Sequence, residues 1–346
     1  MALKVGFAHT DITPPVGTHK IGWLVDIVSE QVLDPLFARV AVFECDGQRV
    51  GFVALDTLSI RWTSVSDMRR RIEQRCGFPG ANVMVAATHN HAGPAVANVG
   101  DVRRDDDYVE TLVGKVVSCF EQAAQNSREA EISFGWRSEF GLSHNRRVVL
   151  RDGTVQTHGS FTNPLALCFG GPLDPEGAVL AARGRDGELL GALVNFTCHP
   201  THHGAGTELS AGYPGVLVHE MARRGCPETL FLNGASGNVH DADPTGRERG
   251  TKEKLGVRLA EDAAGVIEGL EWTPEAKLDA RSRTVQLPFR EVTQDEMRGA
   301  ARGAQRFVDP EAYERDMPRL LARIERMGTQ PAEVQVEGWP VQLQPA

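Results

Sequence analysis

The sequence predicts an α/β fold in which layers of mixed β-sheet are covered by helices. Short apolar runs of strand length alternate with longer segments whose apolar residues recur at helical spacing. This alternation favours sheets that are packed against helices. A chain of 346 residues is also long enough to bury the core that such layers need. Because ligands gather at the carboxyl ends of strands in these folds, we expect the functional site there.

The first half of the chain supplies strands and helices in alternation. Apolar runs predict strands at 36–45, 49–56, 82–87 and 131–137. Helical spacing predicts helices at about 64–76 and 107–125.

The second half continues the alternation up to residue 268. Apolar runs predict strands at 177–183, 189–197 and 229–232, and Asp186-Gly187 predicts a hairpin turn between the first two. Helices are expected at 214–224 and 251–268. No internal repeat is visible in the sequence.

We interpret residues 1–346 as one domain that is truncated relative to a longer architecture. Its motif-bearing core spans 1–245, and 246–346 form an extension of strand and helices. The extension is predicted to contain a strand at 278–289 and polar helices at about 293–306 and 310–327. The charged faces of these helices are expected to be solvated surface.

Composition excludes several functional classes. Lys and Arg total 37 against 46 Asp and Glu, and a net charge of -9 argues against nucleic-acid binding. No apolar run is long enough for stable membrane insertion. The N-terminus lacks the apolar core of a signal peptide, and the six scattered cysteines are typical of reduced thiols. We therefore expect a cytoplasmic protein whose partner is a small-molecule substrate, whereas the sequence leaves the oligomeric state open.

Histidines follow three of the predicted strands. They are His89 and His91 after 82–87, His199 after 189–197, and His240 after 229–232. In extended backbone the two members of a His-x-His pair share a face, so both rings can reach one ligand. Together with His199 they offer three nitrogen donors, a set that suits zinc.

The motifs of several known hydrolase classes do not match. The His-x-His pair lacks the following Asp-His of metallo-β-lactamases, and no HExxH motif occurs. An amidohydrolase barrel needs eight strand–helix repeats, and this chain shows too few. A serine-hydrolase elbow is nearly present at 234–238, which makes Ser236 a candidate nucleophile, although the glycines there also fit a tight loop. Asp56, at the end of another strand, is either a site residue or the cap of a turn.

Seven segments occur in the order and spacing of one known family. They are GFAHTDITPP (6–15), VGFVALDTLSI (50–60), ATHNHAGP (87–94), Asn145-Arg146, NFTCHPT (195–201), GYPG (212–215) and NGASGNV (233–239). Over about residues 3–243 the chain resembles the N-terminal catalytic domain of the neutral/alkaline, non-lysosomal ceramidases and their bacterial relatives.

The resemblance implies a zinc-dependent hydrolase that cleaves an N-acyl amide bond with metal-activated water. It implies that His89 and His199 are zinc ligands and that His91 is a catalytic histidine beside the metal. Arg146 would bind or polarise the substrate near the scissile group. His240 stands where the family has a serine, so it is a candidate catalytic residue or an extra ligand, and it argues against ceramide as the substrate.

The chain departs from the family pattern in its ligands. Gly212 replaces an aspartate, and the family's later glutamate and tyrosine ligands have no counterpart. The tyrosines of this chain are Tyr108, Tyr213 and Tyr313, and none has the family context. Candidate replacements are His91, His202, His203, His240, Asp241 and Asp243.

The leading hypothesis is a zinc-dependent amide hydrolase that acts on a small soluble N-acyl compound. One alternative is a catalytically incomplete remnant that lacks the glutamate and tyrosine ligands. Others are an ester or lactone hydrolase, for which the same metal would serve, and a metal-free serine hydrolase that uses Ser236.

Overall fold

The computed structural model describes residues 2–23, 25–99, 101–246, 250–282 and 285. These residues divide into two compact units. The first comprises 2–146 and 171–280, and the second comprises 147–170 with 281, 282 and 285. All of the predicted site residues lie in the first unit.

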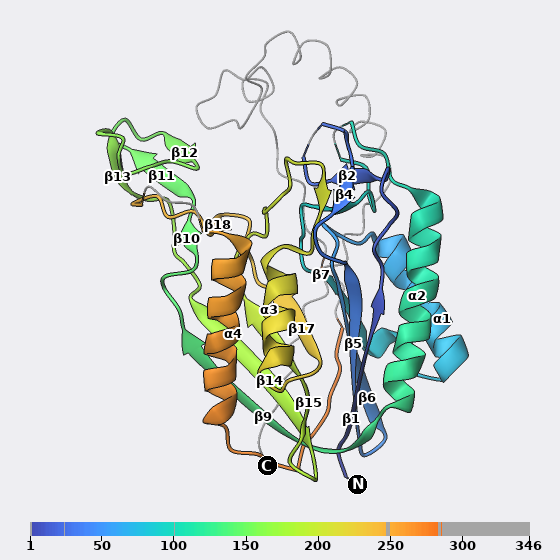
Figure 1. The fold of residues 1–346 in the computed structure, drawn as a ribbon. Helices are drawn as coiled ribbons and strands as arrows, with labels where there is room; N and C mark the ends of the chain where they lie inside the picture. The colour runs from blue at the N-terminus through green and yellow to red at the C-terminus, as the bar shows by residue number, and fades with distance from the viewer. Residues whose placement is uncertain (1, 24, 100, 247–249, 283–284, 286–346) are drawn as a thin grey trace. The chain divides into compact units, whose positions relative to one another are not determined.

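An eight-stranded mixed sheet organises the first unit and confirms the α/β fold class (Figure 1). The strand order is β17-β15-β14-β9-β1-β5-β6-β7. The pairs at the two outer ends, β6 with β7 and β15 with β17, are parallel, and the pairs between them are antiparallel.

One half of the sheet is built from residues 4–87. Its strands are β1 (Lys4–Asp11), β5 (Phe37–Cys45), β6 (Gln48–Leu55) and β7 (Val83–Ala87). Helix α1 (Trp62–Cys76) crosses from β6 to β7 and ends where Gly77 adopts a left-handed backbone conformation. Helix α2 (Asp106–Gln125) follows, and the Asp105 side chain caps it by accepting the Tyr108 N–H at 2.9 Å.

The other half has the same order of elements. Its strands are β9 (Arg128–Ser138), β14 (Glu176–Gly184), β15 (Leu189–Phe196) and β17 (Thr229–Asn233). Helix α3 (Gly212–Arg223) crosses from β15 to β17, and α4 (Lys252–Glu268) follows. Each half is therefore three antiparallel strands, a helix, a parallel strand and a second helix, a repeat of topology that the sequence does not display.

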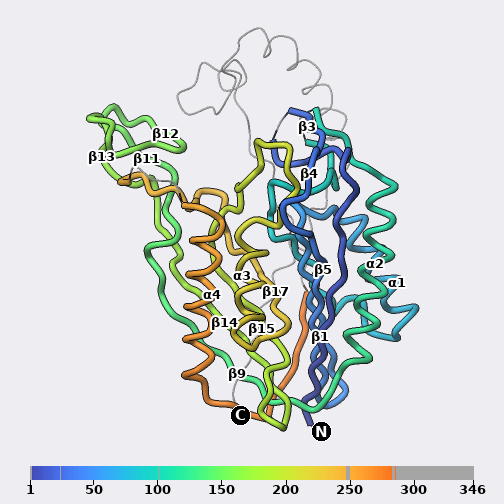
Figure 2. Tube along the Cα trace, in the orientation of Figure 1, coloured from blue at the N-terminus to red at the C-terminus, as the bar shows by residue number. Residues whose placement is uncertain are grey.

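The two half-sheets face each other, with their helices on the outside. Strands β1 and β9 pair only at Lys4 and Val5, so the sheet folds at this junction, and β17 contacts β5, β6 and β7. The contact is close at Gly191, where a Cβ atom would lie 2.9 Å from the Phe7 ring of β1. Figure 2 shows α2 beside β1 and β5, and α4 beside β14, in agreement with the contacts between these elements.

Two apolar cores lie between the helices and the half-sheets. In one, Met68 and Ile72 of α1 and Phe120 of α2 pack on the first half-sheet. In the other, Leu217 of α3 and Leu259 of α4 pack on the second. Each core buries one face of its helices, which is the arrangement that the helical spacing predicts.

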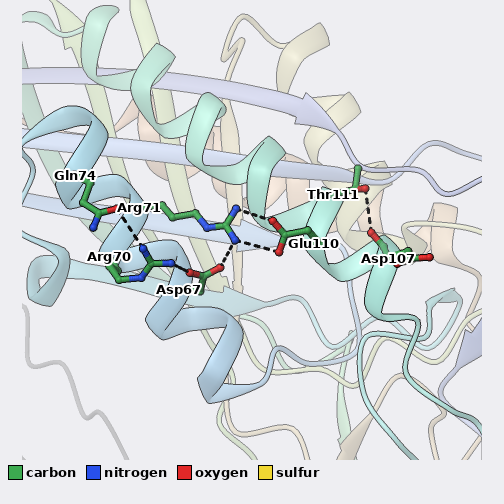
Figure 3. Close-up of polar contacts among 7 residues, drawn as sticks. All are labelled: Asp67, Arg70, Arg71, Gln74, Asp107, Glu110 and Thr111. Carbon is green, nitrogen blue, oxygen red and sulfur yellow. Dashed lines mark hydrogen bonds and ion pairs between the residues drawn. The ribbon is translucent and has the colours of Figure 1, made fainter.

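Ion pairs at the surface add a link between α1 and α2 (Figure 3). Arg71 on α1 donates to both carboxylate oxygens of Glu110 on α2, at 2.7 and 3.1 Å, and also pairs with Asp67 at 2.7 Å. Such exposed pairs contribute little to stability individually.

Short strands near the site connect loops that are distant in the sequence. They are β2 (His19–Ile21), β3 (Ile27–Val28) and β8 (Gly93–Pro94) in one small sheet, β4 (Gln31–Val32) with β16 (Glu208–Leu209), and β10 (His144–Asn145) with β18 (Val239–His240). A short 3-10 helix, η1 (Gly80–Asn82), precedes β7. The second unit contains β11 (Arg147–Leu150), β12 (Val155–Thr157) and β13 (Ala166–Phe169).

The predicted helices and strands up to residue 268 are confirmed to within a few residues, and so is the hairpin turn at Asp186-Gly187. In the stretch predicted as a strand at 278–289, residues 278–282 have no regular structure. The rest of that stretch, apart from 285, and the helices expected at 293–306 and 310–327 lie outside the described residues. Among the helices that are described, none has the length and apolar character needed to cross a membrane.

Candidate metal centre

The loop that follows β7 presents His89 and His91. Two backbone hydrogen bonds fix this loop against the end of β6, one from the Thr88 N–H to the Leu55 carbonyl at 2.9 Å. The side chain of Asn90 between them is fully buried. His89 has a φ of 68°, a left-handed conformation that is uncommon for a residue with a side chain. Such backbone strain is often found at functional sites.

The end of β15 presents His199 from the other half-sheet. Its backbone N–H donates to the Val239 carbonyl at 3.3 Å, so its chain is tied to the loop that follows β17. The side chain is buried. The two half-sheets thus bring their strand ends to one place, as the fold class predicts.

The three imidazoles converge on one point through their Nε2 atoms. The separations are 3.2 Å from His89 to His199, 3.3 Å from His91 to His89, and 2.9 Å from His91 to His199. Among the residues that the structure describes, these three form the group of histidine, cysteine and acidic side chains that is compact enough to bind a metal ion.

The other nitrogen of each ring faces a backbone carbonyl. His89 Nδ1 bonds the Leu58 carbonyl at 2.9 Å, His91 Nδ1 the Gly22 carbonyl at 2.9 Å, and His199 Nδ1 the Ser236 carbonyl at 3.0 Å. Because a carbonyl only accepts, each Nδ1 must carry the hydrogen. In the neutral rings each Nε2 therefore has a lone pair, and the three lone pairs point at one another.

The pKa values of all three histidines are lowered, which keeps the rings neutral. Burial, with the neighbouring His199 and His89, lowers the pKa of His91 to about 3. Burial also lowers the pKa of His199 to about 4 and lowers that of His89. The positive charge of Arg146 acts in the same direction on each ring.

This donor set fits a zinc ion. Three lone pairs at contact distance repel one another unless a cation lies between them. Zinc binds imidazole nitrogens at about 2.0–2.1 Å in tetrahedral geometry, which places two ligand nitrogens about 3.3 Å apart. The Nε2 separations of 2.9 to 3.3 Å are close to that value. Bonds from Nδ1 to carbonyls also fix the tautomer and orientation of zinc-binding histidines.

Arg146 lies beside the three histidines, since its charge acts on all of them. It follows β10, and its backbone N–H donates to the Asn238 carbonyl at 2.8 Å. Its Nη2 donates to the Gly237 carbonyl at 2.7 Å. The glycine-rich loop after β17 therefore holds both the backbone and the guanidinium of this arginine.

His240 lies next to the centre but is not part of it. Its ring stacks on the His199 ring, with centroids 6.4 Å apart. Its Nε2 lies 2.6 Å from Thr201 Oγ1, and its Nδ1 lies 2.7 Å from a carboxylate oxygen of Asp241. Both nitrogens of this ring thus have partners other than the three Nε2 atoms.

The other candidate ligands of the sequence analysis do not belong to the described metal-binding group. His202 faces Asp241 at 3.2 Å, and Asp243 accepts from Thr245. The backbone carbonyl of His203 accepts a hydrogen bond from Lys20 at 3.0 Å.

Two other residues of the sequence analysis have structural partners. Ser236 contributes its carbonyl to His199, so the histidine hydrogen bond is made by the backbone of this residue. Asp56 is buried at the end of β6, where it accepts the Phe37 N–H at 2.9 Å and thereby fastens the start of β5. Burial raises its pKa to about 6, although Arg39 and the Phe37 N–H act in the opposite direction.

Sequence reasoning missed the residues whose carbonyls hold the rings, namely Gly22 and Leu58. A backbone carbonyl leaves no trace in residue type. The one available signal was Gly22 itself, whose φ of 144° and close approach to His91 leave no room for a side chain.

Comparisons with known proteins agree with the resemblance. The chain is 24% identical over 281 residues to the neutral ceramidase of Pseudomonas aeruginosa, covering 73% of this chain and 40% of that protein. The crystal structure of that ceramidase superposes with a TM-score of 0.67 at 22% identity, over 83% of this chain and 48% of the other. A structure described as ceramidase complexed with C2 gives a TM-score of 0.68 at 22% identity, with coverages of 83% and 47%.

No protein-family model matches the chain. It spans less than half the length of the ceramidases that it matches. Within that span, the sequences align and the folds superpose. The chain therefore resembles the neutral ceramidases in sequence, at low identity, and shares their fold.

Proposed function

We propose that this protein is a zinc-dependent hydrolase of N-acyl amide bonds, with the ion bound by His89, His91 and His199. The observation that carries the proposal is the convergence of three Nε2 lone pairs whose tautomers are set by backbone carbonyls. The similarity to a ceramidase supports the choice of an amide as the bond that is cleaved.

The proposal gives His91 the role of a ligand in place of the catalytic role that the sequence suggested. Its Nε2 is as close to the other two as they are to each other. Three histidines are a sufficient ligand set for a catalytic zinc, which keeps its fourth position for water or substrate. The proposed centre therefore needs no protein ligand beyond these three histidines.

When bound, zinc would polarise the scissile carbonyl and lower the pKa of a water molecule to about 7. Arg146 would bind the carbonyl side of the substrate and stabilise the negative charge that develops there, because its guanidinium is held beside the three rings by the Gly237 carbonyl. We propose a small soluble N-acyl compound rather than ceramide as the substrate, because His240 occupies the position of the family's serine.

Metal analysis of the purified protein tests the centre. We expect about one zinc per chain, and less than a tenth of that in His89→Ala, His91→Ala and His199→Ala. His219→Ala is the control, because this exposed histidine lies on α3 outside the group. A zinc content that His89→Ala leaves unchanged would exclude the metal site.

Hydrolysis of matched compounds tests the reaction. Acyl amides of a fluorogenic amine, with acyl chains of increasing length, are compared with the corresponding esters. We expect amide cleavage that is lost on chelation, restored by zinc and reduced in Arg146→Ala with its zinc retained. Cleavage of the esters alone would change the reaction class. Cleavage that survives chelation and is blocked by a fluorophosphonate would instead identify a serine hydrolase.

A further inference from the structure

Four side chains form a row of close polar contacts beside His199. Thr201 Oγ1 lies 2.6 Å from His240 Nε2, and His240 Nδ1 lies 2.7 Å from Asp241 Oδ1. The other oxygen of Asp241 lies 3.2 Å from His202 Nε2. The row joins the loop after β15, which carries His199, to the loop after β17.

Asp241 is the centre of this row. Its side chain is only 6% exposed, and those of His202 and His240 are 13% and 12% exposed. Burial by itself would raise the pKa of this carboxyl, but the adjacent imidazoles of His202 and His240 outweigh it and hold the pKa well below its usual range. Asp241 is therefore a buried carboxylate that lies between two imidazoles, and His240 is the nearer of them.

Two contacts compete for the Nδ1 atom of His240. The Asp241 carboxylate requires a hydrogen on Nδ1, whereas the Ala242 N–H, at 3.0 Å, requires a lone pair there. A carboxylate and a ring lone pair would repel each other at 2.7 Å, and the charged acceptor forms the stronger bond. The Nδ1–H tautomer is thus favoured, and Nε2 is left to accept the hydroxyl hydrogen of Thr201.

The row lies against the metal centre without supporting its ligands. The His240 ring stacks on the His199 ring, and the Pro200 carbonyl accepts the His91 N–H at 3.2 Å. His199 itself is held by the carbonyls of Ser236 and Val239, which are not members of the row. Removal of a row member should therefore change the surroundings of the centre and leave its three nitrogens in place.

We propose that Asp241 is a positioning residue, which holds His240 in the Nδ1–H tautomer and thereby fixes the Thr201 hydroxyl beside the metal centre. Its part in hydrolysis rests on the proposed function, whereas the tautomer does not. Hydrogen-bonding partners of metal ligands typically contribute 10- to 100-fold to activity, and we expect a residue that positions a group beside the centre to act on the same scale. His240 then acts as an acceptor toward Thr201, and not as the catalytic residue or extra ligand that its position in the sequence suggested.

The tautomer is measured by long-range 1H–15N correlation spectra of the zinc-loaded protein with 15N-labelled histidine. The His240 signals are identified by their loss in His240→Gln. We expect hydrogen on Nδ1 in the wild-type protein and on Nε2 in Asp241→Ala, where the Ala242 N–H is the remaining partner. Hydrogen on Nε2 in the wild-type protein would overturn the proposal, and this spectrum needs neither a substrate nor a folded Asp241 variant.

Steady-state kinetics then test the coupling along the row. We expect Asp241→Ala and Thr201→Val each to lower kcat by about 10- to 100-fold with little change in KM and one zinc retained. Thr201→Ser should restore activity, and the double variant should lose no more than either single one. Asp186→Asn, an exposed carboxylate in the β14–β15 turn, is the matched control.

Different outcomes separate the two proposals. Losses that multiply in the double variant, or an unchanged kcat in Thr201→Val, would overturn the coupling while the zinc hydrolase stands. A wild-type protein that binds no zinc and cleaves no amide would refute the proposed function. The His240 tautomer, measured in the metal-free protein, would still decide whether Asp241 positions this ring.

Discussion

The backbone determines how the three histidines of the centre are presented. Leu58, Gly22 and Ser236 lie in three separate segments, and each offers one carbonyl to one Nδ1 atom. These bonds orient the rings before any ion binds. The loss of side-chain conformational entropy therefore occurs on folding and does not weaken metal binding. The affinity for a metal should therefore depend on residues that never touch it.

Gly22→Ala tests this dependence. A Cβ atom at Gly22 would lie 2.5 Å from the His91 backbone oxygen and 2.9 Å from the His91 Cβ, so the carbonyl that holds His91 has to move. We expect zinc affinity to fall by about 10- to 100-fold in competition with a fluorescent chelator. The control is Gly17→Ala, because Gly17 also has a positive φ, of 95°, but no neighbouring atom lies within 4 Å of where its Cβ would be. Equal affinities of the two variants would contradict the prediction.

The buried carboxyl of Asp56 should make the protein less stable as the pH rises. Its folded pKa of about 6 lies above the value of 3.8 for a free carboxyl. Between these values the unfolded chain releases the proton while the folded protein retains it, so stability falls as pH rises through about 4 to 6. The difference corresponds to at most roughly 3 kcal/mol, fully developed near neutral pH.

Asp56→Asn should remove this loss, because the amide oxygen can still accept the Phe37 N–H. In urea unfolding series, we expect the variant to gain stability over the wild-type protein from pH 4 to pH 7 and to reach a plateau above that range. A stability difference that does not change with pH would show that the Asp56 carboxyl has an ordinary pKa.

The site residues differ in how far the sequence predicts them. His89, His91 and His199 were found because strand ends can be read from apolar runs and imidazoles are rare at such positions. The pairing of His91 with His89 was predicted from an extended backbone, but the backbone that brings the two rings together is left-handed at His89, with a φ of 68°. The Asp241 row was not predicted either, because its partners belong to loops whose contacts are set by tertiary structure.

At the scale of elements, helices and strands could be predicted where their apolar residues recur with a clear period. The long helices and the buried strands have clear apolar patterns, and their bounds agree with the structure. Strand β1 (Lys4–Asp11) was missed, although its pairing with β5 runs over its whole length. The two-residue strands that tie the site loops together contain too few residues for any periodic signal.

The packing of α4 on α3 depends on one glycine. A Cβ at Gly256 would lie 2.5 Å from the Val216 Cβ and 2.8 Å from the Tyr213 carbonyl oxygen, so α3 could not approach as closely. On the same helix, a Cβ at Gly265 would have its nearest neighbour, an Arg137 nitrogen, at 3.9 Å. Helix propensity favours alanine over glycine by about 1 kcal/mol at either position.

We therefore expect opposite effects of the same substitution. Gly256→Ala should destabilise the protein by about 1 to 3 kcal/mol, because overpacking outweighs propensity. Gly265→Ala should stabilise it by up to about 1 kcal/mol. Chemical denaturation of both variants gives the two values. Similar changes of the same sign would mean that propensity alone governs α4.

At the scale of the whole first unit, the candidate centre lies where the two topological halves meet. His89 and His91 follow the outer parallel strand β7 of one half, and His199 follows β15 of the other. The sequence could not reveal this arrangement, because the halves share an order of elements but no visible sequence repeat. A ligand held by both halves must stabilise them together.

Metal binding should consequently raise the thermal stability of both halves at once. At a free zinc concentration about 100 times Kd, the native state gains about 2.7 kcal/mol, which corresponds to a few degrees in Tm for a unit of this size. Hydrogen exchange should slow both in 87–94 and in 196–204, because these segments carry ligands from different half-sheets. His199→Ala removes the ligand that the second half contributes, so zinc should leave the Tm of this variant nearly unchanged. The Tm of His219→Ala should rise with zinc as that of the wild-type protein does. If zinc slowed hydrogen exchange only in 87–94, the ion would be bound by one half alone. Metal binding would then not stabilise the contact between the two halves.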